Sequence, residues 1–278
     1  MSSLRDPLDS TTGFWCVRLD SSVGRWYAYE REKLGVYFPS VTTVLGALNK
    51  GKGFEMWLGN SPSYEHAMEY GLEAAHIGSI VHYYIFILLE GSSVDTKQEF
   101  IDEETGEKTK TGRKVNKRLE GFVKFYEDHK PTLLANEVTL FNEAKYKKEY
   151  LFPWAGQADQ VYEIDGKIVM CDNKTGKSYD SHGLQLTAYK LLWDSLFPDK
   201  KIDELWGLYL SDKWIKKPYT IKKYKFEPEM WLNVLDVWLW QNNGSRLKIP
   251  QPKQPKPETT FFELNIDKKE GDPNDGKL

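Results

Sequence analysis

The sequence is poor in cysteine and has no long apolar run. Its 278 residues include only Cys16 and Cys171, which lie far apart along the chain. We therefore expect no disulfide framework and an intracellular, reducing compartment. No uninterrupted run of about 18 apolar residues occurs, so no membrane span is expected. The polar stretch 1–13 lacks the apolar core of a secretory signal.

The sequence also lacks a strong net charge, which is −3. The chain therefore has no overall positive charge that would indicate nucleic-acid binding, and a nucleic-acid-binding surface would have to be a local basic patch. Hydrophobic residues make up 40% of the chain, enough for a packed core. We predict one domain over 1–247, with an N-terminal hairpin and helical part (14–130) and a core (131–247). The tail 248–278 is rich in proline and charge, which predicts disorder. Its apolar piece 259–266 is a candidate contact for a protein partner or for the body of the protein.

Two predicted strands joined by a tight turn organise the core. Residues 154–164 are predicted to form the first strand and residues 168–174 the second. Asp165-Gly166 between them is a strong hairpin signal. The second strand begins with the apolar run Ile168 to Cys171, which is typical of a strand buried on both faces.

Charged residues end this hairpin. Side chains alternate along a strand, so Asp172 and Lys174 point the same way, and the pairing places Asp159 beside Asp172. Neighbouring carboxylates repel unless a cation joins them, and oxygen ligands suit Mg²⁺ or Mn²⁺. Lys174 would then orient or deprotonate a water, which indicates metal-assisted phosphodiester hydrolysis. The alternative is a plain surface ion pair between Asp172 and Lys174, but charges seldom end a buried run without a purpose.

Further motifs surround the hairpin in sequence order. Pro39 to Leu45 precedes a helix containing Trp57, Gly78 to His82 lies in an apolar helix, and Gln185 to Tyr189 follows Lys174. With these motifs the region 36–240 resembles the PD-(D/E)xK nuclease superfamily. More narrowly it looks like the RecB-type exonuclease branch, and the segment from Pro39 to the Trp57 helix is similar to that of mitochondrial genome maintenance exonucleases and their phage relatives. Asn173 stands at a variable place of that pattern, with its side chain expected to face away from Asp172.

The resemblance implies an α/β fold with a restriction-endonuclease-like core, a central mixed β-sheet flanked by helices. It implies Mg²⁺ or Mn²⁺ as cofactor, and two cysteines cannot build the four-cysteine iron–sulfur cluster of some relatives. Catalytic roles would fall to Asp159, Asp172, Lys174, Gln185 and Tyr189. The metal ligands would be His82, Asp159, Asp172, the Asn173 carbonyl and Glu137.

Several of these residues also have simpler interpretations. His82 could be a core histidine of its helix, and Glu137 a surface residue at the start of a strand. Gln185 and Tyr189 lie four residues apart on one helix face. They could form a half-buried face, or Gln185 could bond to the DNA backbone or to the carboxylates with Tyr189 packed beneath it.

Candidate nucleic-acid contacts complete the site. Ser40 and Thr42 open a helix whose N-terminus could bind phosphate, although simple capping is favoured for Ser40. Other candidates are the lysines of an aromatic-rich hairpin, for which a solvated hairpin is the commoner explanation. The full set of candidate DNA contacts is Ser40, Thr42, Thr175, Lys177, Gln185, Lys216 and Lys217.

Together these observations predict a DNA exonuclease acting on single-stranded or end-processed DNA, in replication, recombination or repair. Its expected location is the cytoplasm of a bacterial or phage-infected cell. Two alternatives stay open: a nuclease-like protein that only holds DNA, and a structure- or site-specific endonuclease. Cleavage of a closed circle would indicate an endonuclease, because an exonuclease needs an end.

Local patterns predict the remaining elements. Residues 14–38 should form a β-hairpin, and residues 91–113 a charged excursion. Residues 64–71 and 72–90 are predicted as two helical pieces. Residues 114–130 should form an amphipathic helix, with an apolar stripe of Val115, Leu119, Phe122, Val123 and Tyr126.

Overall fold

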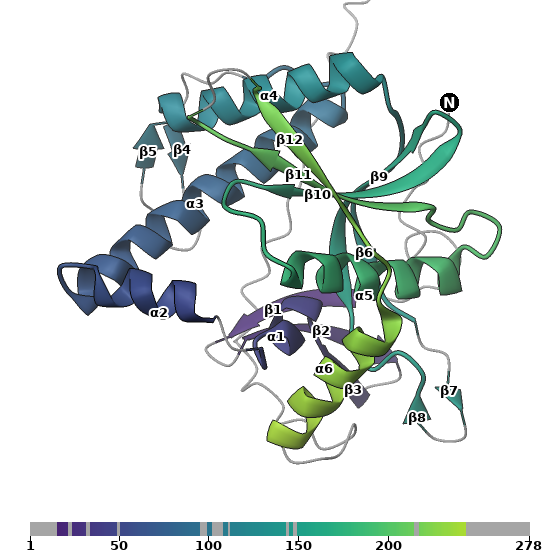
Figure 1. Cartoon of the computed structure of the whole chain (residues 1–278). Coiled ribbons are helices and arrows are strands. Elements are labelled where there is room, and N and C mark those ends of the chain that lie inside the picture. The colour runs from purple at the N-terminus through teal and green to yellow at the C-terminus, as the bar shows by residue number, and fades with distance from the viewer. Residues whose placement is uncertain are drawn as a thin grey trace, which may run out of the picture.

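The computed structural model describes residues 16–21, 24–31, 34–48, 51–94, 99–101, 108–110, 112–142, 145–146, 149–213 and 217–242. At its centre is a five-stranded sheet of order β12-β11-β10-β9-β6 (Figure 1). Strands β10 and β11 are parallel and the other neighbours are antiparallel, so the sheet is mixed. The predicted α/β class is confirmed. The strands are β6 (Thr132–Leu140), β9 (Gly156–Ile164), β10 (Lys167–Lys174), β11 (Glu204–Leu210) and β12 (Tyr219–Tyr224).

The predicted hairpin is present as β9 and β10. Its turn residues Asp165 and Gly166 both have positive φ, at 51° and 74°. The tightest hairpin turns require this of both central residues, and the Asp-Gly pair supplies it at low cost. Strand β9 begins at Gly156 rather than at Trp154, because Ala155 instead forms an isolated parallel bridge with Ser40.

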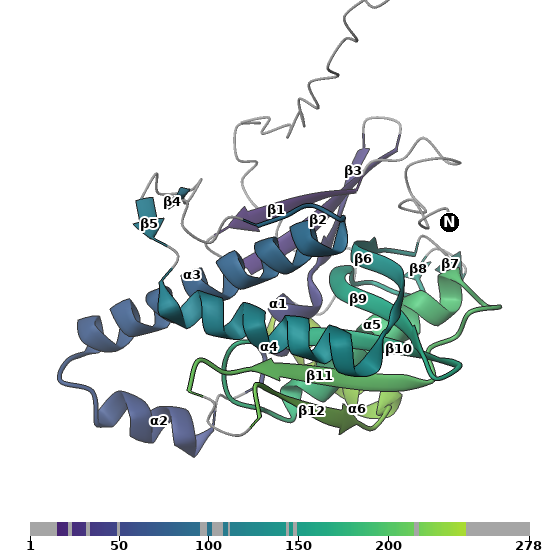
Figure 2. The same cartoon turned by 90° about the horizontal axis from the view of Figure 1, so that it is seen from above.

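Helices cover both faces of the sheet (Figure 2). Helices α3 (Tyr64–Leu89) and α4 (Arg113–His129) pack on one face. The other face carries α1 (Val41–Leu45), α5 (Ser181–Leu196) and α6 (Pro228–Gln241). Along β10, Cys171 belongs to the α3/α4 core and Met170 to the opposite core. This alternation explains why the apolar run is buried on both sides, as the sequence predicts.

The N-terminal region contains one more strand than predicted. The strands β1 (Cys16–Ser21), β2 (Gly24–Arg31) and β3 (Leu34–Pro39) form a three-stranded antiparallel sheet. It is followed by α1 and by α2 (Lys52–Gly59). The remaining strands form two small pairs, β4 (Glu99–Ile101) with β5 (Lys108–Lys110), and β7 (Lys145–Tyr146) with β8 (Glu149–Tyr150).

Two helix predictions need correction. The pieces predicted at 64–71 and 72–90 are one continuous helix, α3, because Gly71 lowers helix propensity without ending the helix. In α4, Val123 is 44% exposed, while Phe125 is fully buried. A period of 3.6 residues puts Phe122 and Phe125 on one face and turns Val123 away from it.

Helix α3 is also long and apolar enough to cross a membrane by length and composition alone, with a mean hydropathy of 1.5 in its most apolar window. Core helices of soluble proteins, which are mostly buried, pass the same test, whereas 22% of this window is buried. The observation is weak evidence, and the absence of a membrane span stays a prediction.

Candidate active site

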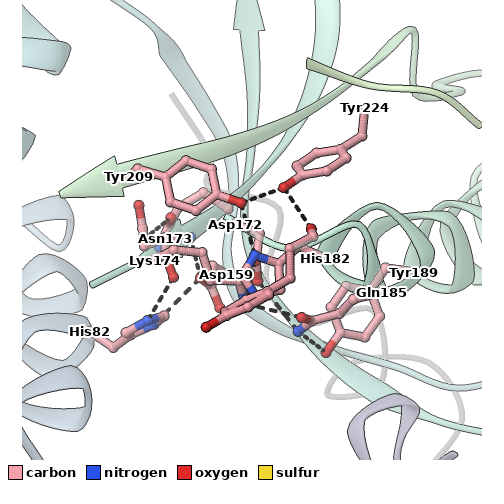
Figure 3. A network of polar contacts seen from close by, with 12 residues as sticks. His82, Asp159, Asp172, Asn173, Lys174, His182, Gln185, Tyr189, Tyr209 and Tyr224 are labelled. Atoms are coloured by element: carbon pink, nitrogen blue, oxygen red, sulfur yellow. Dashed lines mark hydrogen bonds and ion pairs between the residues drawn. The ribbon is translucent and has the colours of Figure 1, made fainter. Parts of the chain in front are cut away.

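The open end of the β9–β10 hairpin brings the charged residues together (Figure 3). Regular pairing ends at Cys171 and Gln160, one step before Asp172 and Asp159. There the Asp159 Oδ2 atom accepts a 2.7 Å hydrogen bond from the backbone N–H of Asn173. Asp159 and Asp172 are both buried, as a strand end covered by helices on both faces requires.

Three side chains from three elements form a possible metal-binding group. His82 of α3, Glu137 of β6 and Asp159 of β9 offer ligand atoms that all lie within 4.8 Å of one another. The His82 Nδ1 atom is 3.4 Å from Asp159 Oδ2 and 3.7 Å from Glu137 Oε1. His82 Nε2 lies 3.1 Å from the carbonyl oxygen of Asn173, the fourth expected ligand. Asp172, the fifth, is not part of this group.

Glu137 occupies an unusual backbone position. It has φ 47°, in the left-handed region, although it lies within β6. The neighbouring pairs Asn136–Gln160 and Val138–Ala158 place it opposite Asp159. A non-glycine residue in this conformation costs about 1–3 kcal/mol, and such strain clusters at functional sites. Here the strained residue belongs to the group of possible ligands.

Unsatisfied oxygen atoms test whether a cation fits. Glu137 Oε1 is buried and makes no hydrogen bond, whereas Asp172 Oδ2 is paired with the Lys174 ammonium at 2.5 Å. A buried carboxylate oxygen without a donor costs free energy, and a divalent cation would satisfy it. Carboxylate and carbonyl oxygens with one imidazole suit Mg²⁺ or Mn²⁺. The residues present therefore fit the expected metal.

The field in this group is negative. Burial lowers the pKa of His82, but the carboxylates of Asp159 and Glu137 outweigh it and raise that pKa to about 9. Burial raises the pKa values of Asp159 and Asp172, with Lys174 and His82 opposing the change. A site that holds an extra proton against burial is one that favours a bound cation.

Lys174 and Asp172 form a pair beside this group. Lys174 Nζ lies 2.5 Å from Asp172 Oδ2 and donates a 3.0 Å hydrogen bond to Gln185 Oε1. Gln185 Nε2 lies 3.2 Å from the Tyr189 hydroxyl and, at a long 3.5 Å, from Asp172 Oδ1. The Gln185 amide is thus committed to the carboxylate and the lysine, and Tyr189 packs beneath it. This arrangement matches the carboxylate-orienting interpretation of Gln185, and its contact with the DNA backbone stays a prediction.

The charge state of Lys174 limits its chemistry. Burial lowers the pKa of Lys174, but the carboxylates of Asp172 and Asp159 outweigh it and raise that pKa. Lys174 therefore stays an ammonium at neutral pH. It can orient a water or stabilise negative charge, whereas removing a proton from water would need the neutral amine.

Gly156 makes room for Tyr189. A Cβ atom added at Gly156 would lie 2.4 Å from Tyr189 Cε1. Replacing Gly156 with alanine should therefore push the Tyr189 ring off Gln185, costing about 1–3 kcal/mol of unfolding free energy as overpacking does. Urea denaturation measures the cost. The matched control is Gly176→Ala, since no atom lies within 4 Å of the added Cβ there; equal stability of the two variants would contradict the steric role.

The other predicted contacts are scattered. Ser40 is 2% exposed and caps α1 by accepting a 3.0 Å hydrogen bond from Thr43 N–H. Thr42 is exposed and shares a hydrogen bond with Ser40. Thr175 is half-buried next to Lys174, and its carbonyl accepts a 3.4 Å bond from Arg118. Lys177 and Lys217 are exposed, and Lys216 lies outside the described residues.

The Ser40 hydroxyl is used within the protein, which favours capping. We expect Ser40→Ala to lower the unfolding free energy by about 1–2 kcal/mol, the usual cost of losing an N-cap. Its affinity for single-stranded oligonucleotides should be unchanged. Thermal denaturation and fluorescence anisotropy measure the two quantities. A loss of affinity without a loss of stability would instead restore Ser40 as a phosphate contact.

Sequence reasoning missed a second cluster at this site. His182 lies one helical turn before Gln185 and bonds to the Tyr209 hydroxyl, which contacts the Tyr224 hydroxyl (Figure 3). The glycines Gly183 and Gly207 admit these rings, since added Cβ atoms would lie within 3 Å of them. The position of His182 three residues before Gln185 was the available signal, because both then lie on neighbouring parts of one helix face.

Comparisons with known proteins add little. No family model and no curated protein match the sequence. A solved structure described as the crystal structure of SSO0001 resembles part of the chain, with a TM-score of 0.31 and 16% sequence identity. The match covers 46% of this chain and 59% of that chain. This resemblance is too weak to bear on fold or function.

Proposed function

We propose that this protein is a divalent-metal-dependent deoxyribonuclease, an exonuclease acting on single-stranded or end-processed DNA. The observation that carries the proposal is the convergence of His82, Glu137 and Asp159 beside the Lys174–Asp172 pair at one end of a hairpin. A ligand group near a half-buried ammonium suits hydrolysis of a phosphodiester, because charge develops on both the attacking and the leaving oxygen.

Each side chain has a distinct part in the proposed reaction. His82, Glu137, Asp159 and the Asn173 carbonyl would hold Mg²⁺ or Mn²⁺, which supplies polarisation of the phosphoryl oxygen when bound. The Lys174 ammonium orients the attacking water and faces the charge that develops on the phosphate. Asp172 keeps Lys174 charged, and Gln185 fixes the position of both through its two hydrogen bonds.

Metal removal tests the proposal. Protein treated with EDTA should not cleave end-labelled oligonucleotides, and Mg²⁺ or Mn²⁺ should restore cleavage. Single- and double-stranded substrates with either terminus blocked, and a closed circle, reveal whether an end is required. DNA binding that persists without cleavage in either metal would contradict the proposed enzymatic activity. Cleavage of the closed circle would contradict the exonuclease.

A further inference from the structure

The hydrogen-bond chain around His182 fixes where its proton lies. The Tyr224 hydroxyl donates to the Tyr179 carbonyl, at 3.0 Å, because a carbonyl can only accept. A tyrosine has a single hydroxyl proton, so the bond between the Tyr209 and Tyr224 hydroxyls must be donated by Tyr209. The 2.8 Å bond between His182 Nδ1 and the Tyr209 oxygen must then be donated by the imidazole. In a neutral imidazole this leaves Nε2 with a bare lone pair.

The imidazole is neutral at physiological pH. Burial and the nearby ammonium of Lys174 lower the pKa of His182 to about 4. Burial, together with the bond to Tyr224, raises the pKa of Tyr209, so its hydroxyl keeps its proton. The donor-to-acceptor direction of this hydrogen-bond chain therefore does not change near neutral pH. His182 Nε2 makes no hydrogen bond to any residue in the described part of the chain, and the side chain is only half-buried.

The other acceptors near Lys174 are already engaged within the protein. Lys174 is an ammonium and can only donate. Asp172 faces Lys174 and Gln185, and the Gln185 carbonyl oxygen accepts from Lys174. The lone pair on His182 Nε2 is thus an unused acceptor near Lys174. Close packing of Tyr224 against Gly183 holds the helix that carries His182 in place.

We propose that His182 accepts, through Nε2, a hydrogen bond from an O–H group in the reacting complex, with its tautomer set by the chain Tyr209–Tyr224–Tyr179 carbonyl. The donor is the attacking water or a terminal hydroxyl of the DNA strand. This inference rests on the proposed nuclease function and adds a residue to it. His182 Nε2 accepts the hydrogen of this O–H group, and the Lys174 ammonium donates an N–H to its oxygen, so the oxygen is oriented by both residues.

Two substitutions separate this role from a structural one. In His182→Asn the amide can replace Nδ1 and keep the bond to Tyr209, but nothing replaces Nε2. In His182→Gln the longer amide reaches the position of Nε2 and loses the bond to Tyr209. We expect the asparagine variant to lose about 100-fold in kcat, a typical contribution of one positioned acid–base group. The glutamine variant should retain most of the rate, and an equal loss in both or the reverse order overturns the proposal.

A matched control is available elsewhere in the fold. His129 also bonds to a tyrosine hydroxyl, at 3.2 Å from Tyr219, but lies at the end of α4. His129→Gln should leave kcat unchanged. Substrates that lack the terminal hydroxyl distinguish the two donors: the defect of His182→Asn disappears on them if the hydroxyl is the donor, and persists if the water is.

The tautomer of His182 can be measured independently of any cleavage activity. Nitrogen-15 NMR of the labelled protein at neutral pH should show the proton of His182 on Nδ1, and Tyr209→Phe should release this preference. A proton on Nε2 in the wild-type protein overturns the inference whatever the activity. Wild-type protein with the expected tautomer but no cleavage in any metal overturns the nuclease function, and with it the role of His182 in that reaction.

Discussion

Replacing Lys174 with glutamine is expected to lower the rate of phosphodiester cleavage on the order of 10³-fold, as loss of a preorganised charge in an active site does. The glutamine keeps a donor near Gln185 but removes the ammonium that lies 2.5 Å from Asp172. Single-turnover cleavage of an end-labelled oligonucleotide in saturating Mn²⁺ measures the chemical step. Cleavage at the wild-type rate would contradict the role of Lys174.

Stability must be separated from activity in this variant. Removing one partner of a buried ion pair typically costs about 3–5 kcal/mol, because the other charge is left without compensation. The double variant Asp172→Asn/Lys174→Gln replaces both charges with neutral hydrogen-bonding groups and should regain much of that cost. It should be as inactive as the single variant. If the double variant is stable and active, the pair is structural only.

A second ion pair, in helix α5, provides the control. Lys190 pairs with Asp194 at 2.6 Å in α5, the helix that carries Gln185. Lys190→Gln removes a partly buried charge without touching the ligand group. Its cleavage rate should match that of the wild type. A lower rate in Lys190→Gln would indicate that the effect of replacing Lys174 comes from distortion of α5.

The sequence was sufficient for the hairpin and insufficient for its surroundings. Asp165-Gly166 and the apolar run after it determine a turn and a doubly buried strand by local rules, which is why Asp159 and Asp172 lie where the pattern predicts. The contact between His82 of α3 and Asp159 of β9 joins residues that are far apart in the sequence. No periodicity places one helix against a particular strand, so only the family resemblance pointed to His82.

Glu137 and His182 show two limits of sequence reasoning. The left-handed backbone of Glu137 is a tertiary feature that no propensity predicts for a glutamate inside a strand. The tautomer of His182 depends on tyrosines contributed by β11 and β12, which follow it by many residues. Both are determined by packing between distant segments, whereas Asp172 and Lys174 needed only the alternation of one strand.

Replacing Asp159 with asparagine is expected to weaken Mn²⁺ binding by about 100-fold or more, because loss of even an outer-shell partner of a metal ligand costs about 10–100-fold. The amide oxygen can still accept the bond from Asn173 N–H, so the backbone of the hairpin should keep its place. What is lost is one of the negative charges that face His82. Titration of Mn²⁺ followed by electron paramagnetic resonance measures the dissociation constant without requiring activity.

The matched control for Asp159 lies on the same strand. Glu163→Gln also removes one carboxylate from β9, but at an exposed position near the turn. Its Mn²⁺ affinity should equal that of the wild type. Glu137→Gln, which keeps the shape of the strained residue, should weaken binding as Asp159→Asn does, because both carboxylates face the same imidazole. If all three variants bind Mn²⁺ as the wild type does, the metal is not held by His82, Glu137 and Asp159, and the hydrolysis proposed from their convergence fails with it.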